Sequence, residues 1–376
     1  MDLGLYLKQL EELVNIDSGS RNAAGVCRVA DRLAAWYADL GWIIEPIELA
    51  EGRRLLLITN HRCERYDAMY VGHMDTVFPD GTAAKRPFRI EGENCYGPGV
   101  GDMKNGDLAM YHIAANLPRE TSDRLDIAMV YNPDEEIGSV YSRATLDAIG
   151  SRADHIFVME SAGNKGIRHC FARKGSLGYV LEFHGQAAHS GFMFEVENAS
   201  AILEMGHYIV ELMALASREQ DTTVNVGLAH GGTAGNVVPD FAQISVEMRF
   251  KKDSERERLK AAVDRLVNGP AFVKGVKTVI ASQRENAPLV KTEAAKAYIA
   301  HVKALADRLG IPFEEKDRGG LSDANHLSRC GHAIVMDGMG PHGALDHSEK
   351  EYGYIGSVEP CVRLHLAILE DLAAGK

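Results

Sequence analysis

Apolar residues along the chain recur at two spacings, one typical of helices and one typical of strands. Leu3, Leu7 and Leu10 follow the three-to-four-residue spacing of a buried helix face, and a second helix is predicted from about Ala24 to Leu40. Short apolar runs bounded by turn-forming residues predict strands at Trp42–Leu49, Arg54–Ile58, Ala68–Val71, Leu125–Tyr131 and Ile156–Met159. Because helical segments alternate with these strands, we expect an α/β fold with a mostly parallel sheet and helices on both faces.

The pattern changes near Gly175. The next segments predict the order β-α-β-β-α-β, which is typical of a ferredoxin-like two-layer α+β domain. These segments are Leu177–Phe183, Asn198–Ser217, Thr222–Ala229, Gln243–Phe250, Ser254–Asn268 and Lys277–Ser282. Long helical patterns resume at Glu293–Leu309 and Ser357–Leu372. The sequence therefore predicts a catalytic domain formed by residues 1–174 and 287–376, with a dimerisation or lid domain inserted at 175–286.

Composition narrows the class of protein. A length of 376 residues exceeds what one core usually supports, and the 45% hydrophobic and 25% charged residues are ordinary for a globular protein. The formal net charge of −12 disfavours nucleic acid as a partner. No apolar run is long enough to span a bilayer, and we expect neither a membrane association nor a secretory signal. Six cysteines without a C-x-x-C pair indicate a reducing, cytoplasmic setting.

The strand at Ala68–Val71 leads into His73 and Asp75. On an extended chain, side chains two positions apart point to the same side. A metal-ligating histidine needs one ring nitrogen on the ion and a carboxylate on the other that fixes its tautomer. The alternative is a surface His-x-Asp pair without a role.

Further oxygen and nitrogen donors follow other predicted elements: Asp102, Glu135 with Glu136, Glu160 and His347. The carboxyl ends of strands in an open α/β sheet form the ligand crevice, so we expect most of these groups to converge there. Donors of this kind without thiolate suit zinc, with manganese or cobalt as substitutes. Taken singly, Asp102 could be a helix cap and the glutamates solvated, and spacing alone does not choose between His347 and His342.

Several segments together resemble one family. Gly72-His73-Met74-Asp75-Thr76-Val77-Phe78-Pro79, Gly101-Asp102-Met103-Lys104, Pro133-Asp134-Glu135-Glu136-Ile137-Gly138-Ser139 and Glu160-Ser161-Ala162-Gly163 are similar to the glutamate carboxypeptidase family of two-zinc metallopeptidases. Its relatives include succinyl-diaminopimelate desuccinylase, acetylornithine deacetylase and the aminoacylases. Segments 185–191, 232–239, 320–325 and 338–347 also match. One departure is Asn105, which stands where the family usually carries a glycine.

The resemblance implies a role for each matching position. His73, Asp102 and Glu160 are expected to hold one zinc ion, and Asp102, Glu136 and His347 the other. Asp75 is expected to orient His73, Glu135 to be the general base, and the bond after Asp102 to be cis. His189 would reach a partner subunit's active site in a homodimer. Asn236 and Arg249 would bind the substrate, with Arg249 on its carboxylate.

These expectations define a zinc hydrolase that cleaves an amide bond next to a free carboxylate. The preferred form is a carboxypeptidase, with glutamate as the residue released, acting on a small peptide. The alternative within the class is an N-acyl amino acid deacylase. A non-catalytic binding protein on the same scaffold is the alternative from another class, and it would require a damaged site.

Overall fold

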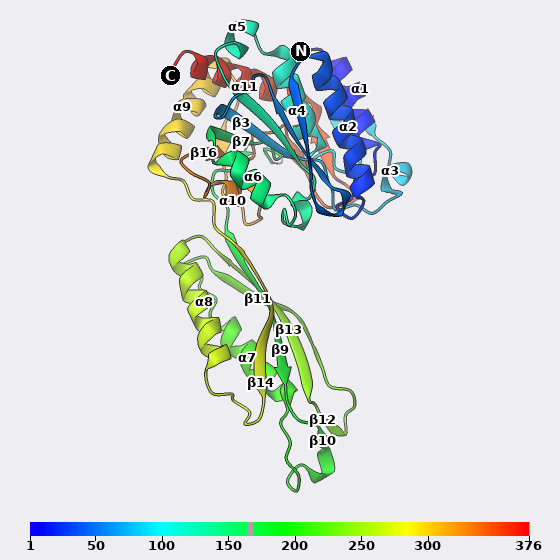
Figure 1. The fold of residues 1–376 in the computed structure, drawn as a ribbon, viewed down its shortest axis with the longest axis vertical. Coiled ribbons are helices and arrows are strands. Elements are labelled where there is room, and N and C mark those ends of the chain that lie inside the picture. Colours follow the sequence, from blue (N-terminus) through cyan, green and yellow to red (C-terminus); the bar gives the residue numbers. More distant parts are fainter. Residues whose placement is uncertain (164–167, 376) are drawn as a thin grey trace. The chain divides into compact units, whose positions relative to one another are not determined.

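The computed structural model describes residues 1–163 and 168–375 (Figure 1). The chain forms two compact units. The first comprises Met1–Ala172, Lys291–Arg318 and Ser322–Lys376, and the second comprises Arg173–Val290 with Gly319–Leu321. The outgoing and returning segments pair with each other at Arg173 and Leu289, and the Arg173 guanidinium donates to the carbonyls of Gly320 and Leu321. These contacts explain why the second unit begins before residue 175 and ends after residue 286.

The first unit contains a six-stranded sheet in the order β1-β2-β6-β3-β7-β16. Its strands are β1 (Ile43–Glu48), β2 (Arg54–Thr59), β3 (Tyr66–His73), β6 (Ile127–Asn132), β7 (Ala153–Val158) and β16 (Ile334–Met336). The pairs β3–β6, β3–β7 and β7–β16 are parallel, while β1–β2 and β2–β6 are antiparallel. The fold is therefore the predicted α/β arrangement with a mostly parallel sheet.

Helices cover both faces of this sheet (Figure 1). One face packs against α1 (Leu3–Val14), α2 (Ala23–Asp39), α4 (Lys104–Asn116), α9 (Glu293–Leu309) and α11 (Val358–Ala373). On β3, Ala68 and Tyr70 belong to this core, as the two-residue period of a strand requires. Two helices that the apolar pattern did not predict, α6 (Arg143–Gly150) and α10 (Asp323–Leu327), contact β7.

Short elements complete the first unit. A second sheet has the order β17-β18-β5-β4. The remaining elements are α3 (Thr82–Lys85), β4 (Arg89–Glu91), β5 (Asn94–Tyr96), α5 (Arg119–Ser122), β8 (Arg168–His169), β15 (Glu314–Glu315), β17 (Gly343–Ala344) and β18 (Tyr352–Tyr354). Single-turn 3₁₀ helices lie at Ala50–Gly52, Glu135–Ile137 and Ile355–Ser357.

The second unit is an antiparallel sheet in the order β11-β13-β9-β14 with two helices on one face. Its elements are β9 (Gly175–His184), α7 (Ala201–Met213), β11 (Thr223–Gly231), β13 (Phe241–Phe250), α8 (Asp253–Asn268) and β14 (Lys277–Asn286). Residues along β13 alternate between buried and half-buried, so one face lines the core. A two-stranded ribbon of β10 (Ala188–His189) and β12 (Val237–Val238) adjoins a short 3₁₀ turn, Ser190–Phe192.

Candidate metal centre and active site

Three adjacent parallel strands deliver donor groups to one end of the first unit's sheet. His73 is the last residue of β3, Glu135 and Glu136 follow β6, and Glu160 follows β7. Because parallel strands end at the same edge, these side chains meet in the crevice beyond it. Asp102 comes from the loop before α4. The peptide bond that follows it, Asp102–Met103, is cis, as expected.

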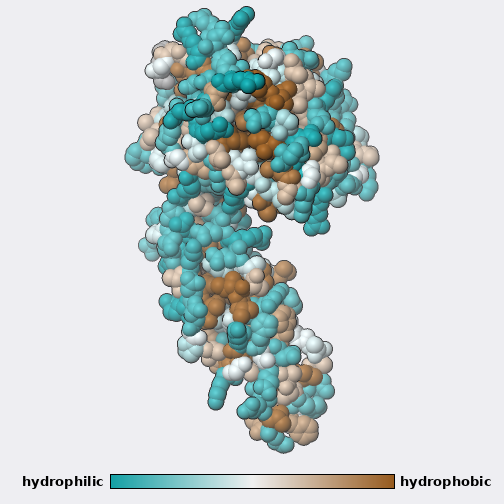
Figure 2. All heavy atoms as spheres, in the orientation of Figure 1, coloured by the Kyte–Doolittle hydropathy of each residue, from teal (hydrophilic) through white to brown (hydrophobic). Residues whose placement is uncertain are grey.

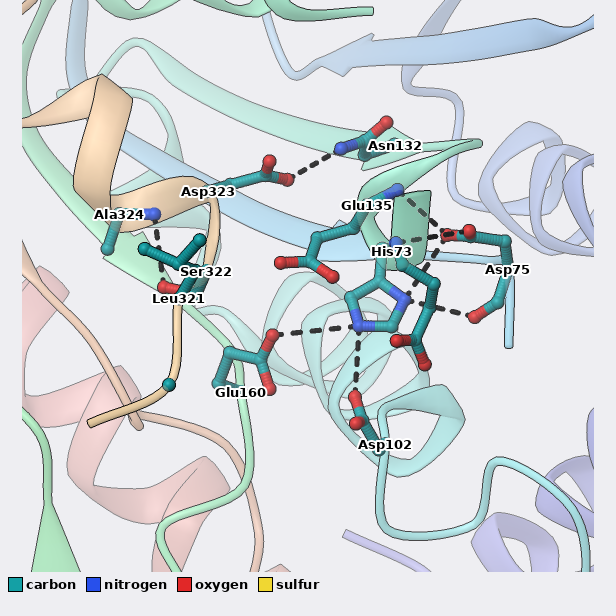
Figure 3. A network of polar contacts seen from close by, with 12 residues as sticks. His73, Asp75, Asp102, Asn132, Glu135, Glu160, Leu321, Ser322, Asp323 and Ala324 are labelled. Atoms are coloured by element: carbon teal, nitrogen blue, oxygen red, sulfur yellow. Dashed lines mark hydrogen bonds and ion pairs between the residues drawn. The ribbon is translucent and has the colours of Figure 1, made fainter. Parts of the chain in front are cut away.

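The first group of donors surrounds the His73 ring (Figure 3). His73 Nε2 lies 3.0 Å from Asp102 Oδ1 and 3.6 Å from Glu160 Oε1. Its Nδ1 lies 3.0 Å from the backbone oxygen of Asp75 and 3.4 Å from the Asp75 carboxylate. A proton on Nδ1, held by the Asp75 carbonyl, leaves Nε2 as the nitrogen that could bind a metal ion among the acids once its own proton is lost.

The second group lies on the other oxygen of Asp102. His347 Nε2 is 3.1 Å from Asp102 Oδ2 and 3.2 Å from Glu136 Oε2. Asp102 thus has one oxygen on each histidine, as a ligand shared by two ions would. His342, the other candidate, is buried elsewhere beside His169 and Cys361, and its backbone N–H donates to Ser357 Oγ.

Buried carboxylates hold the loops that carry these donors. Both oxygens of Asp75 accept backbone N–H groups, from Glu135 at 3.0 Å and from Glu136 at 3.2 Å. Ser20 Oγ also donates to Asp75, at 2.7 Å. Asp75 therefore positions the two glutamates as well as His73, a function that its spacing from His73 does not reveal.

Glu351 was not singled out by its sequence, although it lies four residues after His347. It is 1% exposed and accepts N–H groups from Gly99, Gly101 and Asp102 at 3.2, 2.7 and 3.0 Å. These three bonds fix the backbone of the loop that presents Asp102. The only sequence signal for Glu351 was its closeness to His347 in the chain, and this spacing does not predict that it bonds to the loop before α4.

The electrostatics of the site reflect many acids around two imidazoles. Burial disfavours the charged form of His73, but Asp102, Asp75 and Glu160 outweigh it and hold the His73 pKa well above its usual value. Hydrogen bonds to Asp102 and then Glu136 raise the pKa of His347 to about 11. Burial, followed by neighbouring carboxylates, raises the pKa of Glu135. The cluster thus carries excess negative charge that favours cations.

The residues present fit two divalent metal ions. The ligand atoms of His73, Asp102 and Glu136 lie within 4.8 Å of one another, and so do those of His73, Glu135 and Glu160. Because both groups use His73, which can bind one ion, a second ion would need His347, whose Nε2 lies beside Asp102 and Glu136. Glu136 Oε1 is buried without a hydrogen-bond partner among the described residues. Carboxylate and imidazole donors are the set that zinc accepts at hydrolytic sites. This donor set, at the carboxyl ends of the strands of an α/β sheet, is that of a metallohydrolase.

The chain belongs to peptidase family M20/M25/M40, because the sequence model of this family matches residues 69–371. It is 27% identical to carboxypeptidase G2 of a Pseudomonas strain, over 98% of this chain and 90% of that protein. It is also 27% identical to succinyl-diaminopimelate desuccinylase of Variovorax paradoxus, over 98% of each chain.

Solved structures share the fold. A tripeptidase of Staphylococcus aureus aligns with a TM-score of 0.80 at 21% identity, over 100% of this chain and 99% of that one. A dinuclear metal-binding peptidase of this family from Bacillus subtilis aligns with a TM-score of 0.69 at 15% identity, over 98% of each. The chain is therefore a zinc-dependent hydrolase of the metallopeptidase and amidohydrolase class, with a two-metal site.

Among the described residues, no helix combines the length and apolarity that crossing a bilayer requires.

The three remaining predicted site residues lie in the second unit. His189 and Asn236 are neighbours, because β10 pairs with β12 and the Ser190 N–H donates to the Asn236 carbonyl at 3.0 Å. Both side chains are exposed. Arg249, on β13, forms an ion pair with Glu247 at 2.8 Å, while its Nη1 is buried without a partner among the described residues.

Proposed function

We propose that the protein is a carboxypeptidase that removes a C-terminal residue, with glutamate the preferred one. The observation that carries the proposal is that Asp102 places one carboxylate oxygen on His73 and the other on His347, with Glu135 close to His73 and Glu160. Similarity to carboxypeptidase G2 along nearly the whole chain supports the peptidase form. When bound, two divalent ions supply Lewis acidity toward the scissile carbonyl and make water acidic enough to lose a proton near neutral pH.

The chain's own residues would divide the remaining work. Glu135, held by its backbone N–H on Asp75, would take the proton from water and pass it to the leaving amine, which is worth about 10²–10⁴ in rate. His73, Asp102 and Glu160 would hold one ion, and Asp102, Glu136 and His347 the other. Replacing Glu135 by Gln should abolish turnover while zinc remains bound. Unchanged turnover in that variant would overturn the role of Glu135 as the base, whereas a wild-type protein that turns over neither peptides nor N-acyl amino acids would favour a binding protein.

Substrate preference is tested by a matched panel. Arg249 offers a planar guanidinium that pairs with Glu247 through Nη2, while its Nη1 has no hydrogen-bond partner among the described residues, and such a group suits a carboxylate. Dipeptides ending in glutamate should therefore be cleaved far faster than the same peptides with an amidated C-terminus, and Arg249→Lys should reduce this difference. Equal rates on blocked and free peptides would refute the carboxypeptidase assignment.

N-acyl amino acid deacylation is the second candidate. The similarity to succinyl-diaminopimelate desuccinylase, at the same identity and over the whole chain, is the observation that favours it. N-acetyl and N-succinyl amino acids assayed beside the dipeptides separate the two functions. Faster turnover of the N-acyl amino acids would identify a deacylase.

We further propose a homodimer through the second unit, in which His189 and Asn236 act on the partner's substrate. The outer side of α7 and the edge strand β11 expose Val210 (69%) and Leu228 (68%), and apolar patches are visible on the molecular surface (Figure 2). Val210→Glu should produce a monomer in sedimentation, while Val140→Glu, an equally exposed site in the first unit, should not. A wild-type protein that sediments as a monomer would refute the proposal.

The six cysteines are all free thiols, which supports the expected cytoplasmic setting.

A further inference from the structure

The turn that carries Glu135 and Glu136 is held from two sides. On the first side, the Asp75 carboxylate accepts the backbone N–H groups of both glutamates. These bonds fix the middle of the turn only. The turn runs from Asn132, the last residue of β6, to Ser139, whose φ of +52° lies in the left-handed region that costs energy for a residue with a side chain.

On the second side, Asp323 joins the two ends of the turn, and Figure 3 shows its contact with Asn132. Its carboxylate is almost fully buried, and Oδ2 accepts from Asn132 Nδ2 at 2.7 Å while Oδ1 accepts from Ser139 Oγ at 2.5 Å. Asn132 also donates to Ser139 Oγ at 2.9 Å and accepts the Asp134 N–H at 3.1 Å. One carboxylate, 184 residues further along the chain than Ser139, thus closes the turn into a ring of hydrogen bonds.

Asp323 is itself held in place and kept charged. It opens helix α10, whose N-cap Ser322 donates to Asp337 at 2.6 Å. One turn later, His326 Nε2 lies 3.1 Å from Asp323 Oδ1, and His326 Nδ1 lies 2.5 Å from Asp147 Oδ1. Burial alone would raise the pKa of Asp323, but His326 outweighs it and lowers that pKa. An ionised Asp323 can accept from both ends of the turn at once.

We propose that Asp323 is a positioning residue for the reaction, which sets the direction of the Glu135–Glu136 turn so that one glutamate faces the reacting water and the other faces the metal ions. This inference rests on the proposed role of Glu135 as general base. A chain in which the turn tilts would misplace both glutamates together, and a misplacement of about 1 Å can cost about 10²-fold in rate.

The variant Asp323→Asn keeps the shape of the side chain and exchanges one acceptor for a donor. In either orientation its NH2 group would meet a donor, which is the Asn132 amide on one side and the His326 ring on the other. We expect kcat on the fastest glutamate-terminated dipeptide to fall about 10–100-fold, with KM within about twofold of the wild type. We expect zinc affinity, measured by chelator competition on metal-stripped protein, to fall about tenfold or more because Glu136 moves with the turn.

Two further variants separate positioning from general stability. In the double variant Asn132→Asp with Asp323→Asn, the donor and acceptor exchange places across the same contact, so both kcat and zinc affinity should recover. Glu204→Gln removes a buried carboxylate in the second unit, where it accepts the N–H groups of Phe272 and Val273, and leaves the turn and its partners untouched. It should lower the thermal midpoint while leaving kcat and zinc affinity close to the wild-type values.

The outcomes distinguish this inference from the proposed function. Full activity in Glu135→Gln would overturn the base and, with it, the role given to Asp323. If Glu135→Gln is inactive but Asp323→Asn keeps the wild-type kcat and zinc affinity, the positioning role alone is overturned. It is also overturned if Glu204→Gln reproduces the losses of Asp323→Asn, or if the exchanged pair gives no recovery.

Discussion

Asp107 provides the sharpest test of the electrostatics inside the first unit. It lies on α4 beneath the end of β3, is 0% exposed, and neither carboxylate oxygen has a hydrogen-bond partner among the described residues. Burial raises its pKa well above the usual value, and His73 and Lys104 oppose that shift only in part. We therefore expect Asp107 to be protonated in the folded protein at pH values where it is ionised in the unfolded chain.

The size of the effect follows from linkage. Below the unfolded pKa of about 3.9, Asp107 is protonated in both states, and the folded protein has its full stability. As pH rises from there toward the folded pKa, the unfolded chain loses this proton while the folded protein keeps it, so the free energy of unfolding falls. Over that window the loss is about 1.4 kcal/mol per pH unit. An asparagine in place of Asp107 cannot ionise. Its amide would replace a protonated carboxyl whose O–H group is already buried without a hydrogen-bond partner among the described residues, so the exchange adds little cost of its own. Asp107→Asn should therefore gain stability over wild type as pH rises from 4 toward the folded pKa of Asp107, by on the order of 1 kcal/mol for each pH unit within that window.

Urea unfolding monitored by tryptophan fluorescence measures this difference. Trp36 and Trp42 are the chain's two tryptophans, and both lie in the first unit, so the signal reports the unit that contains Asp107. The experiment uses metal-stripped protein, and Asp307→Asn, an exposed change on α9, is the control that should show no pH-dependent gain. A flat difference between pH 4 and pH 6, or a less stable Asp107→Asn protein at pH 6, would refute the reasoning.

Three further outcomes are expected at the metal centre. Glu351→Gln should weaken zinc binding about 10–100-fold in chelator competition because the Asp102 loop loses an N–H acceptor, whereas the exposed Glu349→Gln should not; equal affinities would contradict this. Zinc binding should release protons from His73 and His347, whose pKa values are raised, so calorimetric affinity should rise from pH 6 to pH 8. Removal of zinc by a chelator should abolish hydrolysis, and zinc should restore it; activity that survives stripping would exclude the two-metal assignment.

Much of the fold follows from local pattern. The long helices and the strands of both units lie within a few residues of their predicted positions, because apolar periodicity reports directly which face each segment buries. The helix α6 and the short strand β16 did not stand out in the apolar pattern. Strand β16 is too short for a periodic signal, and its parallel pairing with β7 depends on residues far earlier in the chain.

Sequence alone determined the chemistry available to this protein: the metal-binding residue types, their order after successive strands, and the family motifs that contain them. Tertiary structure decided which groups act together. It placed His347 rather than His342 on Asp102, and it brought Glu351 to the Asp102 loop and Asp323 to the Glu135 turn. It also left the Asp107 carboxylate without a hydrogen-bond partner among the described residues. The physical reason is that a buried side chain's hydrogen bonds and charge state depend on neighbours that lie far away in sequence, and only folding brings them within bonding distance.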